Sequence, residues 1–171
     1  MPHGLDSTLS YLAMIESAGA HAGMRVINAV FEQPSKIDGA LQLARGEKVL
    51  AVERVRTADD HPVIYSRDRV PARLLNDNLD LRSLDPSLFA LLRSSGHAAD
   101  HATATLRAVA STSFTAKVLG VRRGKPLLYI EEIDYDRDGK PVMLSREWHV
   151  SEAFDVRINR RAQPTPNVPD R

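Results

Sequence analysis

Two arginines, Arg54 and Arg56, have the type and spacing of an anion-binding pair. They stand two residues apart in Lys48–Thr57, a segment that alternates as a β-strand does. Residues two apart on a strand point to the same face, so both guanidinium groups should project from one side. Such a pair can hold a carboxylate or a phosphate through forked hydrogen bonds.

An internal duplication places an acidic pair at the matching position. Ser35–Thr57 aligns without a gap on Ser113–Tyr135, and the arginine pair is matched by Glu132 and Asp134. The identical positions are Ser35/Ser113, Leu41/Leu119, Arg45/Arg123, Gly46/Gly124, Leu50/Leu128 and Glu53/Glu131. Identities that keep the apolar pattern in step indicate one structural unit that occurs twice.

Two arrangements of these charges are open. If the two copies face each other, a basic pair and an acidic pair line a polarised cleft between them. Alternatively, Arg54 and Arg56 pair with Glu132 and Asp134 as a ladder of solvated cross-strand ion pairs. Sequence geometry alone favours the ladder.

A Ser-Arg dipeptide also recurs in the two copies. After one inserted residue, Ser66 and Arg67 match Ser145 and Arg146. The recurrence favours a shared structural role, although either serine can also donate a hydrogen bond to a ligand.

The sequence lacks the residues that common catalytic and metal-binding sites require. The chain has no cysteine, which excludes thiolate metal sites and cysteine nucleophiles. His97 and His101 have the spacing of helical metal ligands, but they lie in a predicted loop without a carboxylate to complete a site. No glycine-rich phosphate loop or nucleophile elbow occurs. We therefore expect no metal, no cofactor and no catalytic residue.

The candidate residues belong to two predicted β-α-β-β units, at about residues 25–71 and 103–150. Alternating apolar residues and turn signals predict six strands. These are Arg25–Glu32, Lys48–Thr57, Pro62–Val70, Thr103–Ala110, Pro126–Tyr135 and Pro141–Val150. Because hairpins dominate, we expect an α+β fold: a six-stranded, mainly antiparallel sheet flanked by helices.

Capping signals predict the helix of each unit. In the first unit, Ser35 and Asp38 should form a capping box, and the helix should close near Gly46. In the second, Ser113 should be the N-cap, and the helix should close near Gly124.

Further helices and a tail are expected outside the two units. Asp85 should begin a helix in the connector, and Asp6 or Ser7 should begin an N-terminal one. Residues 160–171 contain three prolines and read as a flexible tail. We therefore assign residues 1–159 to one domain.

Length and charge narrow the class of protein. A chain of 171 residues fits one domain with a single core. The net charge of +1 lacks the basic excess of a domain that grips nucleic acid by its phosphates. No apolar run approaches the ~20 residues that span a bilayer, and no signal peptide is evident. We expect a cytoplasmic domain that does not bind membranes.

The ordered series of motifs resembles the UTRA domain, the effector domain of GntR-family bacterial transcription regulators, and within them the HutC subgroup. The resemblance covers roughly residues 5–158. Its first half runs through Leu41, Gly46-Glu47, Val49-Leu50, Glu53-Arg54-x-Arg56, Ala58-Asp59, Pro62-Val63 and Val70-Pro71. Its second half runs through Ser87-Leu88-Phe89, Leu119-Gly120-Val121, Gly124, Pro126-Leu127-Leu128, Tyr135-Asp136, Asp138-Gly139, Pro141-Val142 and Ser145-Arg146.

The resemblance implies a chorismate-lyase-like fold, a homodimer, and an effector pocket that controls an N-terminal winged helix-turn-helix domain. We expect that DNA-reading domain to be absent from this chain, since nothing before Asp6 could encode it. The candidate effector-binding residues are Ser10, Tyr11, Arg54, Arg56, Ser66, Ser87, Ser145 and His149.

Three positions depart from the family pattern and shape the expected ligand. Ser66 and Met143 stand where the family often has glutamates, and His149 stands where it often has a tyrosine. In amino-sugar sensors those carboxylates meet sugar hydroxyls or the amine. We therefore expect a less hydroxylated anion, such as a carboxylate, a phosphonate or another phosphorylated metabolite. From the family resemblance we expect the regulator to be a repressor.

Two other functions are compatible with the same fold. A chorismate-lyase-like enzyme would cleave pyruvate from an aromatic acid, but this rests on analogy of fold alone. It would need an arginine–carboxylate set, and the expected carboxylate positions hold Ser66 and Met143. A structural dimerisation module would show no ligand response.

Overall fold

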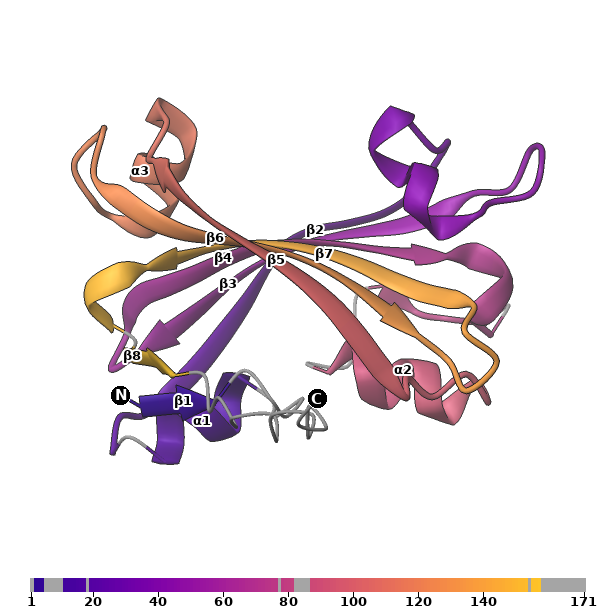
Figure 1. Cartoon of the computed structure of the whole chain (residues 1–171), viewed down its shortest axis with the longest axis horizontal. Helices are drawn as coiled ribbons and strands as arrows, with labels where there is room; N and C mark the ends of the chain where they lie inside the picture. The colour runs from indigo at the N-terminus through magenta and orange to yellow at the C-terminus, as the bar shows by residue number, and fades with distance from the viewer. Residues whose placement is uncertain are drawn as a thin grey trace, which may run out of the picture.

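The computed structural model describes residues 2–4, 11–17, 19–76, 78–81, 87–153 and 155–157. Its main element is a six-stranded sheet in the order β2-β3-β4-β7-β6-β5, with antiparallel neighbours throughout (Figure 1). The strands are β2 (Ala22–Glu32), β3 (Val49–Ala58), β4 (His61–Pro71), β5 (His101–Ala110), β6 (Pro126–Tyr135) and β7 (Pro141–Val150). The predicted fold class and the six predicted strands are confirmed.

The two copies lie side by side in this one sheet. They meet where β4 pairs with β7, and Arg67 lies opposite Arg146 in that pair. Residues that match in the sequence alignment therefore point to the same side of the sheet. The copies do not face each other across a cleft; instead they form one continuous surface on each side.

Short helices lie on both sides of the sheet. One side carries α1 (Tyr11–Ser17) and α2 (Leu88–Ser94), and the other carries η1 (Lys36–Leu41) and α3 (Ser113–Leu119) (Figure 1). We call these sides the α1/α2 face and the η1/α3 face. None of the helices in the described ranges is long enough to cross a bilayer.

The remaining elements are small and were not predicted. η2 (Ala72–Leu74) follows β4, and η4 (Ser151–Ala153) follows β7. β1 (Pro2–Gly4) pairs in parallel with β8 (Asp155–Arg157), which joins the two ends of the described chain. Three-residue strands carry too little sequence pattern to be recognised by alternation.

The helix of the first unit starts as predicted and ends early. The Asp38 carboxylate accepts a hydrogen bond from the backbone N–H of Ser35 at 2.7 Å, as the capping box requires. The element is a 3-10 helix, and Gln42 ends it in the left-handed conformation at φ 51°, before Gly46 is reached.

The helix of the second unit is shifted at both ends. Its N-cap is Thr112, not Ser113, because the Thr112 hydroxyl accepts the backbone N–H of Thr115. It ends at Gly120 (φ 65°), four residues before Gly124. Thr112 and Ser113 can both cap a helix, and Gly120 and Gly124 can both end one. The structure uses the earlier residue of each pair, Thr112 and Gly120.

The connector helix α2 also begins at a different residue. Its N-cap is Ser87, whose hydroxyl accepts the backbone N–H of Ala90 at 3.2 Å, so the prediction of Asp85 is wrong. Asp6, Ser7 and the tail at 160–171 lie outside the described residues.

Each face of the sheet has two apolar ends and a polar middle. α2 and α1 each cover an apolar cluster at one end of the α1/α2 face, and η1 and α3 do the same on the opposite side. Representative buried members are Leu50, Leu91 and Met143 under α2, Ile15 and Ile64 under α1, Leu41 and Leu144 under η1, and Leu119 and Leu127 under α3. The polar middle between two such clusters is where a site can form.

Candidate functional site

Polar residues from four adjacent strands meet in the middle of the α1/α2 face. The register places Arg54 opposite Ser66, and Ser66 opposite Glu147. Asp68 lies opposite Ser145, and Ser145 lies opposite Glu132. Among the described residues, this middle contains Arg54, Arg56, Ser66, Asp68, Glu132, Asp134, Ser145, Glu147 and His149, with Tyr11 reaching it from α1.

Arg54 is held by Asp68 on the neighbouring strand. Its Nε and Nη2 atoms donate to Asp68 Oδ2 at 3.1 and 2.7 Å, and the Ser66 hydroxyl donates to the same oxygen at 3.0 Å. Arg54 is 3% exposed. Separating the two partners would leave a buried charge without compensation, which is strongly destabilising, so the ion pair holds Arg54 in place.

Arg56 has a less complete set of partners. Its Nη1 atom lies 3.7 Å from Glu147 Oε1, has no hydrogen-bond partner and is buried. The guanidinium carbon lies 4.8 Å from the centre of the Tyr11 ring, a cation–π contact. Burial lowers the pKa of Arg56, and the charge of Arg54 lowers it further. The pair therefore presents two like charges with one donor unsatisfied.

Glu147 contacts Tyr11, His149 and Arg56. Its Oε2 atom accepts hydrogen bonds from the Tyr11 hydroxyl and, at 2.9 Å, from His149 Nε2. Burial alone would raise the pKa of Glu147, but the hydrogen bond and charge of His149 and the charge of Arg56 outweigh it and lower the pKa. Burial and the neighbouring Glu147 raise the pKa of Tyr11, so the hydroxyl remains a donor.

The acidic pair occupies the β6 side of the same face. Burial raises the pKa of Glu132 to about 7 and that of Asp134 to about 8, and the charges of Glu147 and Asp68 contribute to both. Asp134 is 0% exposed, and neither of its side-chain oxygens has a hydrogen-bond partner. Arg54 and Arg56 pair with other carboxylates, so the solvated ladder is wrong.

The structure gathers most of the predicted site residues. Tyr11, Ser66, Ser145 and His149 join the two arginines, whereas Ser87 caps α2 and Ser10 lies outside the described residues. Their role in binding an effector stays a prediction.

Sequence reasoning missed two central residues, Asp68 and Glu147. The signal was available, because each stands two residues after a serine of the recurring Ser-Arg dipeptide, on the same strand face. These carboxylates stand at positions other than 66 and 143, where the family pattern had directed attention. Met143 lies in the apolar cluster under α2.

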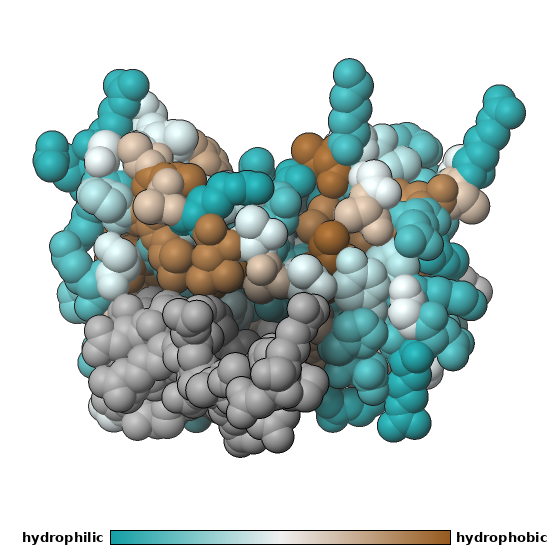
Figure 2. Space-filling model, viewed as in Figure 1, coloured by the Kyte–Doolittle hydropathy of each residue, from teal (hydrophilic) through white to brown (hydrophobic). Residues whose placement is uncertain are grey.

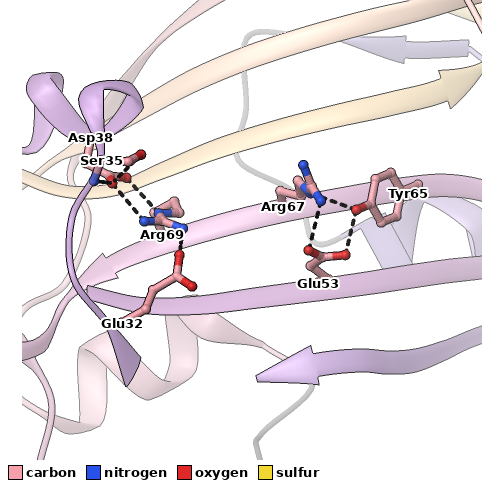
Figure 3. Close-up of polar contacts among 7 residues, drawn as sticks. All are labelled: Glu32, Ser35, Asp38, Glu53, Tyr65, Arg67 and Arg69. Atoms are coloured by element: carbon pink, nitrogen blue, oxygen red, sulfur yellow. Dashed lines mark hydrogen bonds and ion pairs between the residues drawn. The ribbon is translucent and has the colours of Figure 1, made fainter. Parts of the chain in front are cut away.

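The middle of the η1/α3 face carries a different, symmetric network. Arg67 bonds Glu53 at 3.0 Å, and Arg146 bonds Glu131, the matching glutamate, at 2.9 Å. The Tyr65 hydroxyl also donates to Glu53 at 2.7 Å (Figure 3). The recurring arginine thus has the shared structural role that its repetition indicated.

Arg69 fastens η1 to this face. Its Nε and Nη2 atoms each donate to the Asp38 carboxylate at 2.7 Å, and Nη1 pairs with Glu32 (Figure 3). The same carboxylate that caps η1 therefore anchors it to β4.

Two hollows lie away from the arginine pair. One, of about 320 Å³, sits between the helical ends of the η1/α3 face, where Figure 2 shows a notch at the top, and is lined by Arg67, Arg107, Tyr129, Arg146 and Trp148 among others. The other, of about 630 Å³, lies between the loop at 96–100 and the β6–β7 turn. Arg54 and Arg56 line neither hollow and are buried in the polar middle of the α1/α2 face, so neither hollow is the predicted polarised cleft. Within the described ranges, no three histidine or acidic side chains are grouped to hold a metal.

Comparisons with known proteins point to one family. The family model of the UTRA domain matches residues 17–155. PhnF from Mycobacterium smegmatis has a TM-score of 0.85 at 23% identity, covering 95% of this chain and 72% of that one. The separate effector domain of the same PhnF gives 0.82 at 23% identity, covering 95% and 100%. A GntR-family transcriptional regulator from Enterococcus faecalis V583 gives 0.74 at 25% identity, covering 81% and 100%. Curated protein sequences gave no match.

Proposed function

The chain belongs to the UTRA domain family, and from this premise we propose that it is the ligand-sensing domain of a GntR-type transcription regulator, with a small anionic metabolite as its effector. The site we assign to the anion is the pair Arg54 and Arg56. Carboxylates, phosphonates and phosphorylated compounds all present the oxygens that a guanidinium binds.

The incomplete pairing of Arg56 is the observation that carries this proposal. Its Nη1 atom is buried without a hydrogen-bond partner, and the charge of Arg54 acts against it. A buried donor without an acceptor costs about 1–3 kcal/mol. An anion held between the two arginines would accept that hydrogen bond and relieve the repulsion.

Control of DNA binding would follow from a difference in affinity. An effector changes DNA affinity only if it binds one arrangement of the regulator better than the other, typically by ~1–3 kcal/mol. We propose that the arrangement is that of a homodimer, that DNA binding resides in a separate domain, and that the regulator is a cytoplasmic repressor. Light scattering on the purified chain should give twice the monomer mass; a monomer at micromolar concentration counts against this part.

The direct test is thermal unfolding with phosphate, acetate, methylphosphonate and simple sugar phosphates. Binding to the folded state should raise the melting temperature in a concentration-dependent way. Arg56→Gln should abolish the rise, whereas Arg107→Gln, an exposed arginine on the other face, should preserve it. A rise that survives Arg56→Gln would place the anion elsewhere.

The lyase is the second candidate, and one observation now favours it more than the sequence did. Buried arginine–carboxylate pairs do exist on the α1/α2 face, at Arg54–Asp68 and Arg56–Glu147. Incubation with chorismate, followed by chromatography for 4-hydroxybenzoate, tests it. We expect no product; turnover that Arg56→Gln removes would establish the enzyme instead.

A further inference from the structure

On the α1/α2 face, the carboxylates on β4 and β7 have cationic or hydrogen-bonding partners, whereas those on β6 do not in the described residues. Asp68 is engaged by Arg54, and Glu147 is engaged by His149, Tyr11 and Arg56. On the β6 side, by contrast, neither a hydrogen bond nor an ion pair joins Glu132 or Asp134 to any residue in the described ranges. Two acidic groups thus stand beside two further carboxylates with no cation of their own.

The side chains opposite this acidic pair on the neighbouring strands are small or uncharged. Ala104 of edge strand β5 lies opposite Glu132, and Ala102 lies opposite Asp134. On the β7 side Ser145 and Met143 lie opposite the same two residues, and neither can supply a positive charge. Glu132 is only half-buried and Ala104 is exposed, so a small group can approach from the β5 edge.

Resting on the proposed function, we infer that the effector is zwitterionic: its anionic group binds at Arg54 and Arg56, and an organic ammonium group binds at Glu132 and Asp134. The two subsites lie within reach of one small molecule. Glu132 is the diagonal cross-strand neighbour of Glu147, a relation that separates Cα atoms by about 7–8 Å, and Glu147 lies beside the Arg56 guanidinium.

An ammonium group fits the acidic pair better than a divalent metal does. Calcium takes six to eight oxygen ligands, and magnesium takes six in a strict octahedron. No group of three or more acidic or histidine side chains is arranged for a metal in the part of the chain that the structure describes. An ammonium has three N–H donors, which two carboxyl groups and a serine hydroxyl such as Ser145 can accept.

Proton release provides a signature of this binding mode. Asp134 faces Glu132, Asp68 and Glu147, and its pKa of about 8 keeps its carboxyl largely protonated at neutral pH. An arriving ammonium favours the ionised carboxylate, so the proton should pass to the buffer. Binding of an anion alone at the arginine pair would not release it.

The test compares ω-aminoalkyl phosphates of two to five carbons with n-alkyl phosphates of the same length, by isothermal titration calorimetry on the full chain. The best amino compound should bind about tenfold more tightly than its alkyl partner. Titration in buffers of different ionisation enthalpy at pH 7 should show release of up to one proton for the amino series only.

Variants separate the subsites. Asp134→Asn and Glu132→Gln should bring the two series within about twofold of each other, and Asp134→Asn should also remove the proton release. Glu132→Gln serves if Asp134→Asn does not fold, because Glu132 is half-buried. Asp138→Asn, a matched change in the exposed β6–β7 turn, should retain the preference.

The outcomes distinguish this inference from the function on which it rests. Equal binding of both series to the wild type, lost in Arg56→Gln, would overturn the ammonium subsite and leave the anion sensor standing. No binding of either series up to millimolar concentration would count against the sensor itself. Magnesium or calcium binding that Glu132→Gln removes would overturn the inference in favour of a metal.

Discussion

The polar middles of the two sheet faces are built from the same two copies, yet they differ in symmetry. On the η1/α3 face both copies make the same contact, Glu53 with Arg67 and Glu131 with Arg146. On the α1/α2 face the matching positions hold residues of opposite type: Arg54 is buried in an ion pair, whereas no cationic side chain of the described residues pairs with Glu132. The symmetric side links β3 to β4 in one copy and β6 to β7 in the other. The asymmetric side holds unsatisfied groups that a ligand could engage.

Burial separates the two middles as clearly as symmetry does. The Arg67 side chain is 51% exposed, and that of Arg54 is 4% exposed. Water screens the first ion pair and leaves it worth little, whereas the second pair is strong only while both partners are present. Removing one partner of an arginine–carboxylate pair should therefore cost more stability on the α1/α2 face than on the η1/α3 face.

The largest expected difference comes from removing one arginine on each face. Arg54→Ala should cost about 3–5 kcal/mol of unfolding free energy, because it leaves Asp68 as a buried unpaired charge. Arg67→Ala should cost no more than about 1 kcal/mol, because Glu53 remains partly solvated. Urea unfolding measures both. Equal losses would mean that burial does not distinguish the faces.

A second comparison removes one tyrosine hydroxyl from each face. Tyr11→Phe deletes the donor to buried Glu147 and should cost about 1.5–3 kcal/mol, typical of a hydrogen bond to a charged group. Tyr129→Phe deletes the 3.0 Å hydrogen bond to Glu131 and should cost less than about 1 kcal/mol, because Glu131 is partly exposed and water can replace the lost donor. Differential scanning calorimetry of both variants tests this order, and a larger loss for Tyr129→Phe would reverse it.

The pH dependence of stability should come mainly from the α1/α2 face. The folded state keeps the Asp134 proton until about pH 8, whereas an unfolded aspartate releases it near ~4. The folded state therefore binds more protons between these values, so stability should fall as pH rises through this window, by up to about 1.4 kcal/mol per pH unit. Glu132, with a pKa of about 7, contributes in the same direction.

Asp134→Asn should flatten that fall, measured as unfolding free energy from pH 5 to pH 8. Asp138→Asn is the matched control and should keep the wild-type slope. An unchanged slope in Asp134→Asn would show that the carboxyl is already ionised in the folded protein.

The smallest expected effects test the symmetry itself. Glu53→Gln and Glu131→Gln each remove one charge from matching ion pairs on the η1/α3 face. Each should cost about 0.2–1 kcal/mol, and the two losses should agree within a few tenths. Chemical unfolding of the two variants side by side measures this. A clear inequality would show that the copies have diverged on this face as well.

The strands and the duplication could be predicted from the amino-acid sequence. Alternation sets which residues share a strand face, and glycine and aspartate set where hairpins turn, because both are properties of the local chain. For the same reason Arg54 and Arg56 could be placed on one face of their strand, and Glu132 and Asp134 on the matching face of theirs. The parallel pairing of β1 and β8 lay beyond sequence reasoning, since the two strands are three residues long and come from opposite ends of the chain.

How the charges are paired became clear only from the folded sheet. The pairing of β3 with β4 placed Asp68 beside Arg54, and the pairing of β4 with β7 placed Glu147 beside Arg56. Both arginines are therefore paired with carboxylates other than Glu132 and Asp134. Strand order and register set these distances, and neither is encoded in the spacing of charges along one strand. An ion pair depends on distance and burial in three dimensions, so the sequence could name the charged residues but could not assign their partners.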